Sequence, residues 1–583
     1  MASRRIFTSF ADLRSEYDFV IVGAGIGGSV LANRLSEDPS VSVLVIEAGG
    51  DESNNPQMQV PFMGVRLPGG PADWKFASTP QKGLEDRQIA CARGKALGGT
   101  TRINLMTWNN GGAELWDSWA KITKNEGWGW KSARSYYKKV CHLVPPADGR
   151  DTHGFVAPSA HGDGPVAVSV PGHPTALDKL VFDALDDLGG TWAFNIDFNA
   201  GTCLGTGYMQ SSIGNGERSD AASAYLYPAS TRPNVDILVN AQVTRLVPVS
   251  GIQPPDFRTV EMAQSSEGPR HTITATKEVI LAAGVIGSPQ ILQLSGIGPP
   301  DLLSSHNIPV IVANPAVGAN YQEHVTVGLH FEVNSTDTWD TVLRDPEATN
   351  AALALWKEKR QGLFVNSPAN THSFVRLRDD NPIFEEHPDP AAGPRSAHLE
   401  VIYCNGFAPF GGAPPPTSGN YMTVLTSLVS PMSRGTLRIA SRDPFAAPHI
   451  DPALLTHPFD VAAMTQAVTN ALWLTGATPF KRYVRGPVGP AARLHGHDDA
   501  KAAFVREHAR TMNHPCGTCA MAADEDASEG VVDAKLRVEG VRGLRVVDAS
   551  VFPTIPNCHI QAVIYIVAER AADLIKTQHG LAK

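Results

Sequence analysis

Two histidines, His514 and His559, lie in loops that flank a short apolar run, Leu544 to Val547, which is typical of a buried strand. The geometry of a sheet could bring the two loops together. A neutral imidazole, with a pKa near ~6.5, can accept a proton at neutral pH and later return it. The pair is therefore a candidate for acid–base catalysis, although most histidines in a chain of this size are surface or structural residues.

A glycine-rich turn near the N-terminus predicts a dinucleotide-binding unit of strand, turn, helix and second strand. Gly23 allows the tight turn, Gly25 lets the backbone approach a pyrophosphate, and Gly28 lets the helix pack close to the sheet. Amide groups at the helix N-terminus can donate to phosphate oxygens. Glu47 ends the second strand about 20 residues past the glycines, where an acidic side chain holds ribose hydroxyls. This order favours a nucleotide site over an ordinary glycine turn.

A second glycine-rich loop runs from Arg93 to Asn104, with two hydroxyl side chains directly behind paired glycines. Such a loop can bring backbone amides against a flat or anionic ligand. Taken alone, it could equally be a tight turn into a helix.

The composition is typical of a soluble globular enzyme. A chain of 583 residues is too long for one hydrophobic core, so we expect two or more domains. The net charge of −9, without a Lys/Arg block, argues against nucleic acid or an anionic membrane as a partner. No apolar run approaches the ~18 residues of a membrane span.

The cysteines and the N-terminal residues indicate in which cellular compartment the protein is expected. Seven cysteines, sparse and odd in number, do not resemble a disulfide framework. Cys516 and Cys519 form a C-x-x-C pair without a second pair or ligand cluster, so no metal site is predicted. Charges interrupt residues 1–16 and leave no secretory signal, so we predict a cytoplasmic protein unless a signal was removed from a secreted form.

Apolar periodicity predicts further elements. The segment Pro388 to Pro416 is crowded with Pro and Gly and is expected to form irregular loops. Helices are predicted over Ala176 to Leu188, Asp460 to Leu474 and Gln561 to about Lys576, and strands over Val235 to Val247, Thr272 to Ala283 and Tyr421 to Leu428.

Separated segments of the chain resemble the glucose-methanol-choline (GMC) oxidoreductases, FAD enzymes that oxidise alcohols. These segments are Gly23 to Glu47, Gly94 to Asp117, Gly284 to Gly298 and the two histidine loops. Shorter motifs between these segments also resemble this family, so the resemblance extends over essentially the whole chain.

The resemblance implies the GMC oxidoreductase fold. An α/β, Rossmann-like FAD-binding domain would comprise residues 15–160, 201–325 and 508–583. An α+β substrate-binding domain with a six-stranded antiparallel sheet would comprise residues 161–200 and 326–507. Some members tether the flavin to a histidine, and the matching position here is Ile103, so FAD would be non-covalent.

The resemblance also implies the site residues. His514 would be the base, and His559 would hydrogen-bond the substrate oxygen and help to hold the developing alkoxide. His324 would support the pyrophosphate region or have a structural role. The cofactor-binding residues carried over are Gly23, Gly25, Gly27, Gly28, Glu47, Ala48, Arg93, Gly98, Gly99, Thr100, Asn104, Val243, Asp548, Ala549, His559 and Gln561.

The pair of histidines at these two positions resembles that of glucose oxidases and dehydrogenases and of aryl-alcohol oxidases. The sequence from Pro556 to Tyr565 is most similar to that of the last group. We therefore expect oxidation of a primary aryl or conjugated alcohol to the aldehyde, with hydride transfer to flavin N5 and O2 or a quinone as acceptor. Asn513 departs from that group, which tends to have an aromatic residue just before the first histidine. The alternative is a non-redox lyase or cyclase on the same fold, in which FAD is structural.

Overall fold

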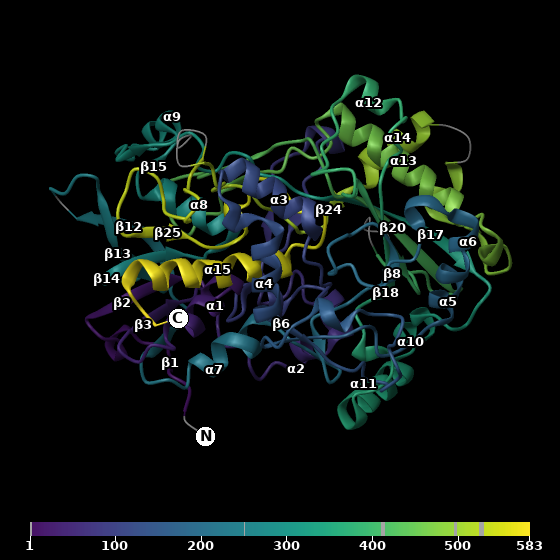
Figure 1. Ribbon diagram of the computed structural model, residues 1–583, viewed down its shortest axis with the longest axis horizontal. Helices are drawn as coiled ribbons and strands as arrows, with labels where there is room; N and C mark the ends of the chain where they lie inside the picture. Colours follow the sequence, from purple (N-terminus) through teal and green to yellow (C-terminus); the bar gives the residue numbers. More distant parts are fainter. Residues whose placement is uncertain (1–2, 250, 410–413, 495–497, 524–529, 583) are drawn as a thin grey trace.

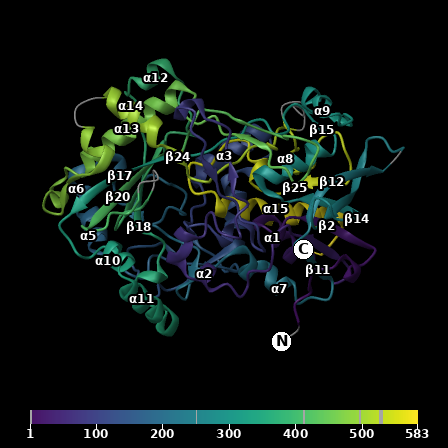
Figure 2. The same ribbon diagram turned by 180° about the vertical axis from the view of Figure 1, so that it is seen from behind.

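The computed structural model describes residues 3–249, 251–409, 414–494, 498–523 and 530–582. Two sheets lie toward opposite ends of the long axis of the molecule (Figure 1). The view from behind shows the same separation, with both chain termini on the side of the first sheet (Figure 2).

The first sheet is eight-stranded and contains the predicted nucleotide-binding unit. Its strand order is β1-β11-β3-β2-β14-β13-β12, and β25 pairs with β14. Pairs among β11, β3, β2, β14 and β25 are parallel, whereas β14, β13 and β12 are antiparallel. The bounds are β1 Ile6–Phe7, β2 Glu16–Val22, β3 Val43–Ile46, β11 Val235–Leu238, β12 Gln242–Val249, β13 Asp256–Ala263, β14 His271–Leu281 and β25 Leu544–Val546.

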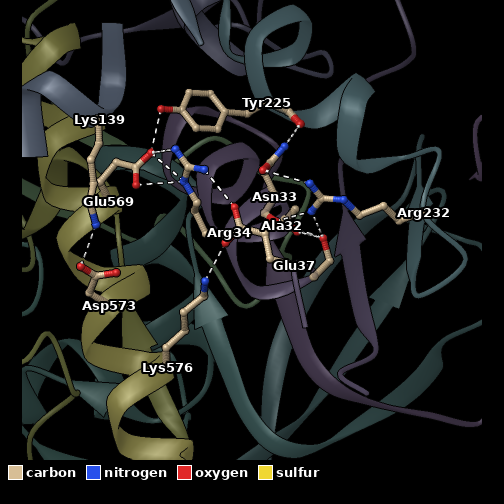
Figure 3. A network of polar contacts seen from close by, with 11 residues as sticks. Ala32, Asn33, Arg34, Glu37, Lys139, Tyr225, Arg232, Glu569, Asp573 and Lys576 are labelled. Atoms are coloured by element: carbon tan, nitrogen blue, oxygen red, sulfur yellow. Dashed lines mark hydrogen bonds and ion pairs between the residues drawn. The ribbon is translucent and has the colours of Figure 1, made fainter. Parts of the chain in front are cut away.

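Two helices cover this sheet and join the two ends of the chain. α1 (Ile26–Leu35) follows the glycine turn, and α15 (Gln561–His579) follows the second histidine loop. Arg34 donates to Glu569 over 2.9 Å, and Lys576 donates to Glu37 over 2.7 Å (Figure 3). The Tyr225 hydroxyl donates to the same Glu569 carboxylate over 2.8 Å. These contacts anchor the helix after His559 to the helix after the glycines.

The second sheet is antiparallel and has seven strands, one more than the resemblance implied. Its order is β23-β17-β20-β19-β18-β8, and β24 pairs with β17. Helices α13 (Pro458–Leu474) and α14 (Asp498–His508) lie beside it (Figure 1). The bounds are β8 Gly205–Tyr208, β17 Val325–Val333, β18 Ala369–Val375, β19 Leu399–Cys404, β20 Tyr421–Leu428, β23 Val484–Pro487 and β24 Arg510–Thr511.

The predicted domain ranges remain a proposal. Strands β8 and β24 pair within the second sheet, although the ranges 201–325 and 508–583 were predicted for the FAD-binding domain. Strand pairing therefore favours assigning β8 and β24 to the substrate-binding domain.

Three sequence predictions need correction. The expected strand Val235 to Val247 is two strands, β11 and β12, because Asn240 turns the chain with a φ of 57°. The expected helix Ala176 to Leu188 is interrupted at Ala184 between α5 (Ala176–Asp183) and α6 (Leu185–Leu188). The expected loop Pro388 to Pro416 contains the fully buried strand β19, whose apolar run is not alternating because both faces are covered.

The cysteines and the helices show two further features. All seven cysteines are free and buried. Among the described residues, no helix is long and apolar enough to cross a membrane.

Candidate active site

The glycine turn after β2 forms one wall of a cavity of about 1240 Å³. A Cβ on Gly27 would lie 1.9 Å from the Val547 carbonyl oxygen, and one on Gly28 would lie 1.9 Å from that of Gly23. These two glycines are therefore needed for packing. A Cβ on Gly25 would meet no described protein atom within 4 Å. Gly25 is thus the position where the backbone of the turn is open to a ligand.

The second glycine loop lies directly on the first. The Gly98 amide donates to the Ala24 carbonyl over 2.9 Å. A Cβ on Gly99 would approach the Gly25 Cα to 2.7 Å. The two loops together make a cradle without side chains, which fits the pyrophosphate of a dinucleotide such as FAD.

Glu47 lies beside this cradle with both carboxylate oxygens engaged. They accept hydrogen bonds from the Ala24 and Gly49 amides over 2.9 and 2.8 Å. Burial raises the pKa of Glu47. Glu47 also lines the cavity, so the proposed contact with ribose hydroxyls would use the remaining acceptor capacity of its carboxylate.

The other predicted cofactor residues are gathered around the same cavity. Asn104 donates to Gln561 over 3.0 Å, which links the second glycine loop to the start of α15. Asp548 accepts from the Gly284 amide over 2.9 Å. Of the predicted set, only Gly28 and Gly98 do not line the cavity; those that do are Gly23, Gly25, Gly27, Glu47, Ala48, Arg93, Gly99, Thr100, Asn104, Val243, Asp548, Ala549, His559 and Gln561.

The structure brings His514 and His559 together at the cavity wall. Their ring centroids are 4.7 Å apart and the rings are nearly perpendicular, at 76°. Burial lowers the pKa of His514 well below its usual value, and the neighbouring His559, His324 and Arg93 side chains lower it further. His514 is therefore a neutral imidazole at neutral pH, as a base must be.

Glu400 is a functional candidate that the sequence analysis missed. Its Oε1 lies 2.9 Å from His559 Nε2 and 2.9 Å from His372 Nδ1. Burial alone would raise the pKa of Glu400, but the charges and hydrogen bonds of the two histidines lower it to about 2. The available signal was a lone acidic residue in an apolar run, inside a segment that we expected to be irregular.

Glu400, His372 and His559 also have the residue types and the spacing of a metal site. Their ligand atoms lie within 4.8 Å of one another. The hydrogen bonds that both histidines make to one carboxylate oxygen account for this spacing without an ion.

His324 lies at the histidine pair and not at the nucleotide turn. Its Nδ1 is 3.0 Å from His514 Nδ1, and its side chain is fully buried. The preceding residue, Glu323, accepts the backbone amides of His324 and His514 at one oxygen, Oε1, over 2.9 and 2.8 Å.

Glu323 should make the stability of the protein depend on pH. Burial raises its pKa from 4.5 to about 7, against the opposing effects of Thr511, Arg93 and the two amides. The folded state then binds a proton that the unfolded chain has lost, so this contribution is full below the unfolded pKa and disappears as the pH rises through about 7. The contribution is on the order of 3 kcal/mol.

The variant Glu323→Gln lacks this titration but keeps an acceptor for both amides. Its Tm relative to that of the wild type should therefore rise between about pH 5 and about pH 8. Thermal unfolding of both proteins at the two pH values measures this difference. A difference in Tm that does not change with pH would contradict the prediction.

Comparisons with known proteins agree with this arrangement. Two family models described as GMC oxidoreductase match residues 17–326 and 431–568. Dehydrogenase eriK from Hericium erinaceus is 36% identical, with 97% of this chain and 95% of that protein covered. Pyranose dehydrogenase 3 from Leucoagaricus meleagris is 35% identical, with 97% and 94% covered.

Solved structures give the same result. Formate oxidase from Aspergillus oryzae RIB40 has a TM-score of 0.88 at 29% identity, with 97% of this chain and 99% of that chain covered. A fungal aryl-alcohol oxidase has a TM-score of 0.84 at 26% identity, with 97% and 100% covered. The chain therefore belongs to the GMC oxidoreductase family, whose members are FAD-dependent oxidases and dehydrogenases.

Proposed function

We propose that the protein oxidises a primary alcohol next to an aromatic or conjugated system to the aldehyde, and that O2 or a quinone takes up the electrons. The observation that carries this proposal is the His514–His559 pair at the wall of the cavity that the glycine cradle also lines. An alcohol beside both rings would meet a neutral base and a hydrogen-bond donor at the same time.

The two histidines have different tasks in this reaction. Bound FAD supplies the hydride acceptor. His514 accepts the hydroxyl proton, because burial keeps its ring neutral. His559 uses Nε2 for Glu400, so Nδ1 is the ring nitrogen left for the substrate oxygen. A hydrogen on this Nδ1 would hold the developing alkoxide.

FAD would be held without a covalent bond. Ile103, at the tethering position, has no nucleophile and is buried in an apolar cluster with Met58, Leu67, Ala72 and Ala96. Acid precipitation of the yellow protein should leave the flavin in solution. Flavin that stays with the precipitate would contradict this part of the proposal.

Asn513 does not form an aromatic gate. Its backbone has a φ of 60°, which Asn tolerates better than an aromatic residue. Its side-chain oxygen accepts the Ala92 amide over 2.9 Å and so joins the first histidine loop to the segment before Arg93. The side chain of Asn513 thus connects these two segments by a hydrogen bond.

An aryl or conjugated primary alcohol should be a better substrate than a pyranose. Beyond the glycine cradle the cavity has apolar walls, which favour a flat apolar group. Residues contributing to these walls are Phe62, Trp339, Leu343, Ile402, Phe407 and Leu425. We expect kcat/KM for benzyl-type alcohols to exceed that for glucose by at least about tenfold.

A panel of aryl alcohols, furans, sugars and aliphatic alcohols tests this expectation. Peroxide formation and dye reduction should be assayed in parallel, because they distinguish O2 from a quinone-type acceptor. A clear preference for glucose over benzyl-type alcohols would contradict the proposed substrate class.

A further inference from the structure

His324 forms a buried pair with His514 behind the cavity wall. It immediately precedes β17, and its side chain is fully buried. The Nδ1 atoms of the two rings are 3.0 Å apart, and the rings are nearly perpendicular, at 83°. His324 therefore contacts the proposed base without lining the cavity itself.

Two imidazole nitrogens at this distance share a single hydrogen. Burial lowers the pKa of His324 to about 3 and lowers that of His514 well below its usual value, so both rings are neutral. A neutral imidazole carries one ring hydrogen. The ring that donates at Nδ1 must therefore have a bare Nε2, and the ring that accepts must have its hydrogen on Nε2.

The surroundings of His324 and the role of His514 distinguish the two arrangements. Its Nε2 has no hydrogen-bond partner of normal geometry among the described residues. The backbone carbonyls of Pro556 and Val429 nevertheless act on this ring and oppose the effect of burial on its pKa. Because Nδ1 faces His514, a carbonyl oxygen beside this ring would accept a hydrogen from Nε2. As a base, His514 also needs a bare Nε2, and a hydrogen on His324 Nε2 with acceptance at its Nδ1 meets both requirements.

The backbone keeps the two rings in this relation. Glu323 Oε1 accepts the amides of both His324 and His514. The Met512 amide donates to the His324 carbonyl over 3.1 Å. Backbone hydrogen bonds in both directions between Gln322 and Cys516, each 3.0 Å long, continue the pairing. The loop of His514 is therefore held against His324 at several points.

We propose that His324 is a positioning residue that fixes the tautomer of His514 by accepting its Nδ1–H, so that the bare Nε2 of His514 is the atom available to the substrate hydroxyl. This inference deepens the proposed function, because it rests on the choice of His514 as the base. Without this acceptor, His514 would place its hydrogen on Nε2 and become unable to accept a proton there.

Substitutions at His324 separate this role from packing. In His324→Asn the side-chain oxygen can take the place of Nδ1 and accept the same hydrogen. In His324→Gln the amide reaches toward the place of Nε2, and His324→Leu has no polar atom. An unpaired buried donor is disfavoured strongly enough that Gln and Leu should slow flavin reduction at saturating alcohol by about ten- to hundredfold. Asn should stay within about threefold of the wild type, and KM should change little in all three variants.

Anaerobic rapid mixing measures flavin reduction, and FAD content and Tm are compared in the same preparations. Equal rates in the Leu variant and the wild type would overturn the inference. So would an Asn variant as slow as Leu when both retain FAD, because a purely structural role would not depend on an acceptor at Nδ1.

Neutron diffraction from deuterium-exchanged crystals of the holoenzyme tests the tautomer without any substrate. We expect deuterium on His514 Nδ1 and on His324 Nε2. Deuterium on His514 Nε2 would overturn the inference. If no alcohol reduces the wild-type flavin, the proposed function fails, and the neutron map still decides the tautomer.

Discussion

His514→Ala should retain FAD but reduce its flavin with substrate at least ~10²-fold more slowly than the wild type, the typical loss for a missing general base. The cofactor should remain because the cradle around Gly25 and Gly99 and the Glu47 carboxylate do not depend on this ring. Anaerobic rapid mixing of each protein with an aryl alcohol measures the rate directly. Near-normal flavin reduction in the variant would remove His514 from the role of base.

The double variant provides the matched control for this assignment. His559→Ala should also slow flavin reduction, since it removes the group that would hold the substrate oxygen. His514 and His559 would act on one hydroxyl, so their losses should not be independent. The double variant should therefore lose less than the product of the two single losses. A fully multiplicative loss would show that the two rings act separately.

Gly25→Ala should lose about ten- to hundredfold in FAD affinity while the protein still folds. A Cβ there meets no described protein atom within 4 Å, and the backbone, with a φ of −68° and a ψ of −161°, is open to Ala. With the pyrophosphate at this turn, as we propose, the Cβ would press against the cofactor, so FAD affinity should fall as it does when a packed site is overfilled. Titration of the apoprotein with FAD, followed by flavin fluorescence, measures the change.

Gly27→Ala is the matched control, because its Cβ would lie 1.9 Å from the Val547 carbonyl oxygen. This variant should lose folded protein, seen as a lower Tm or poor solubility, whether or not FAD is present. A Gly25→Ala protein with wild-type FAD affinity would contradict the placement of the pyrophosphate at this turn.

The parts of the site that the sequence predicted are those that short segments encode. The glycines mark positions where a Cβ has no room or where the backbone must stay open, as at Gly28 and Gly25. His514 and His559 each begin or end a short loop with a recognisable pattern. The structure places both histidines and the glycine turn at one cavity.

The parts that the sequence did not predict depend on strand pairing between distant segments. Glu400 reaches His559 only because β19 pairs with β18 and β20 in the second sheet. The position of His324 follows from the pairing of the segment before β17 with the loop of His514. Neither contact leaves a periodic signal along the chain, and the Pro and Gly around β19 concealed the strand itself.

Anaerobic mixing of the wild-type protein with a benzyl-type alcohol shows directly whether the bound flavin oxidises the alcohol. We expect the bound flavin to be bleached and one aldehyde to form per flavin reduced. Conversion of the alcohol while the flavin stays oxidised would contradict it and would favour a lyase or cyclase in which FAD is structural.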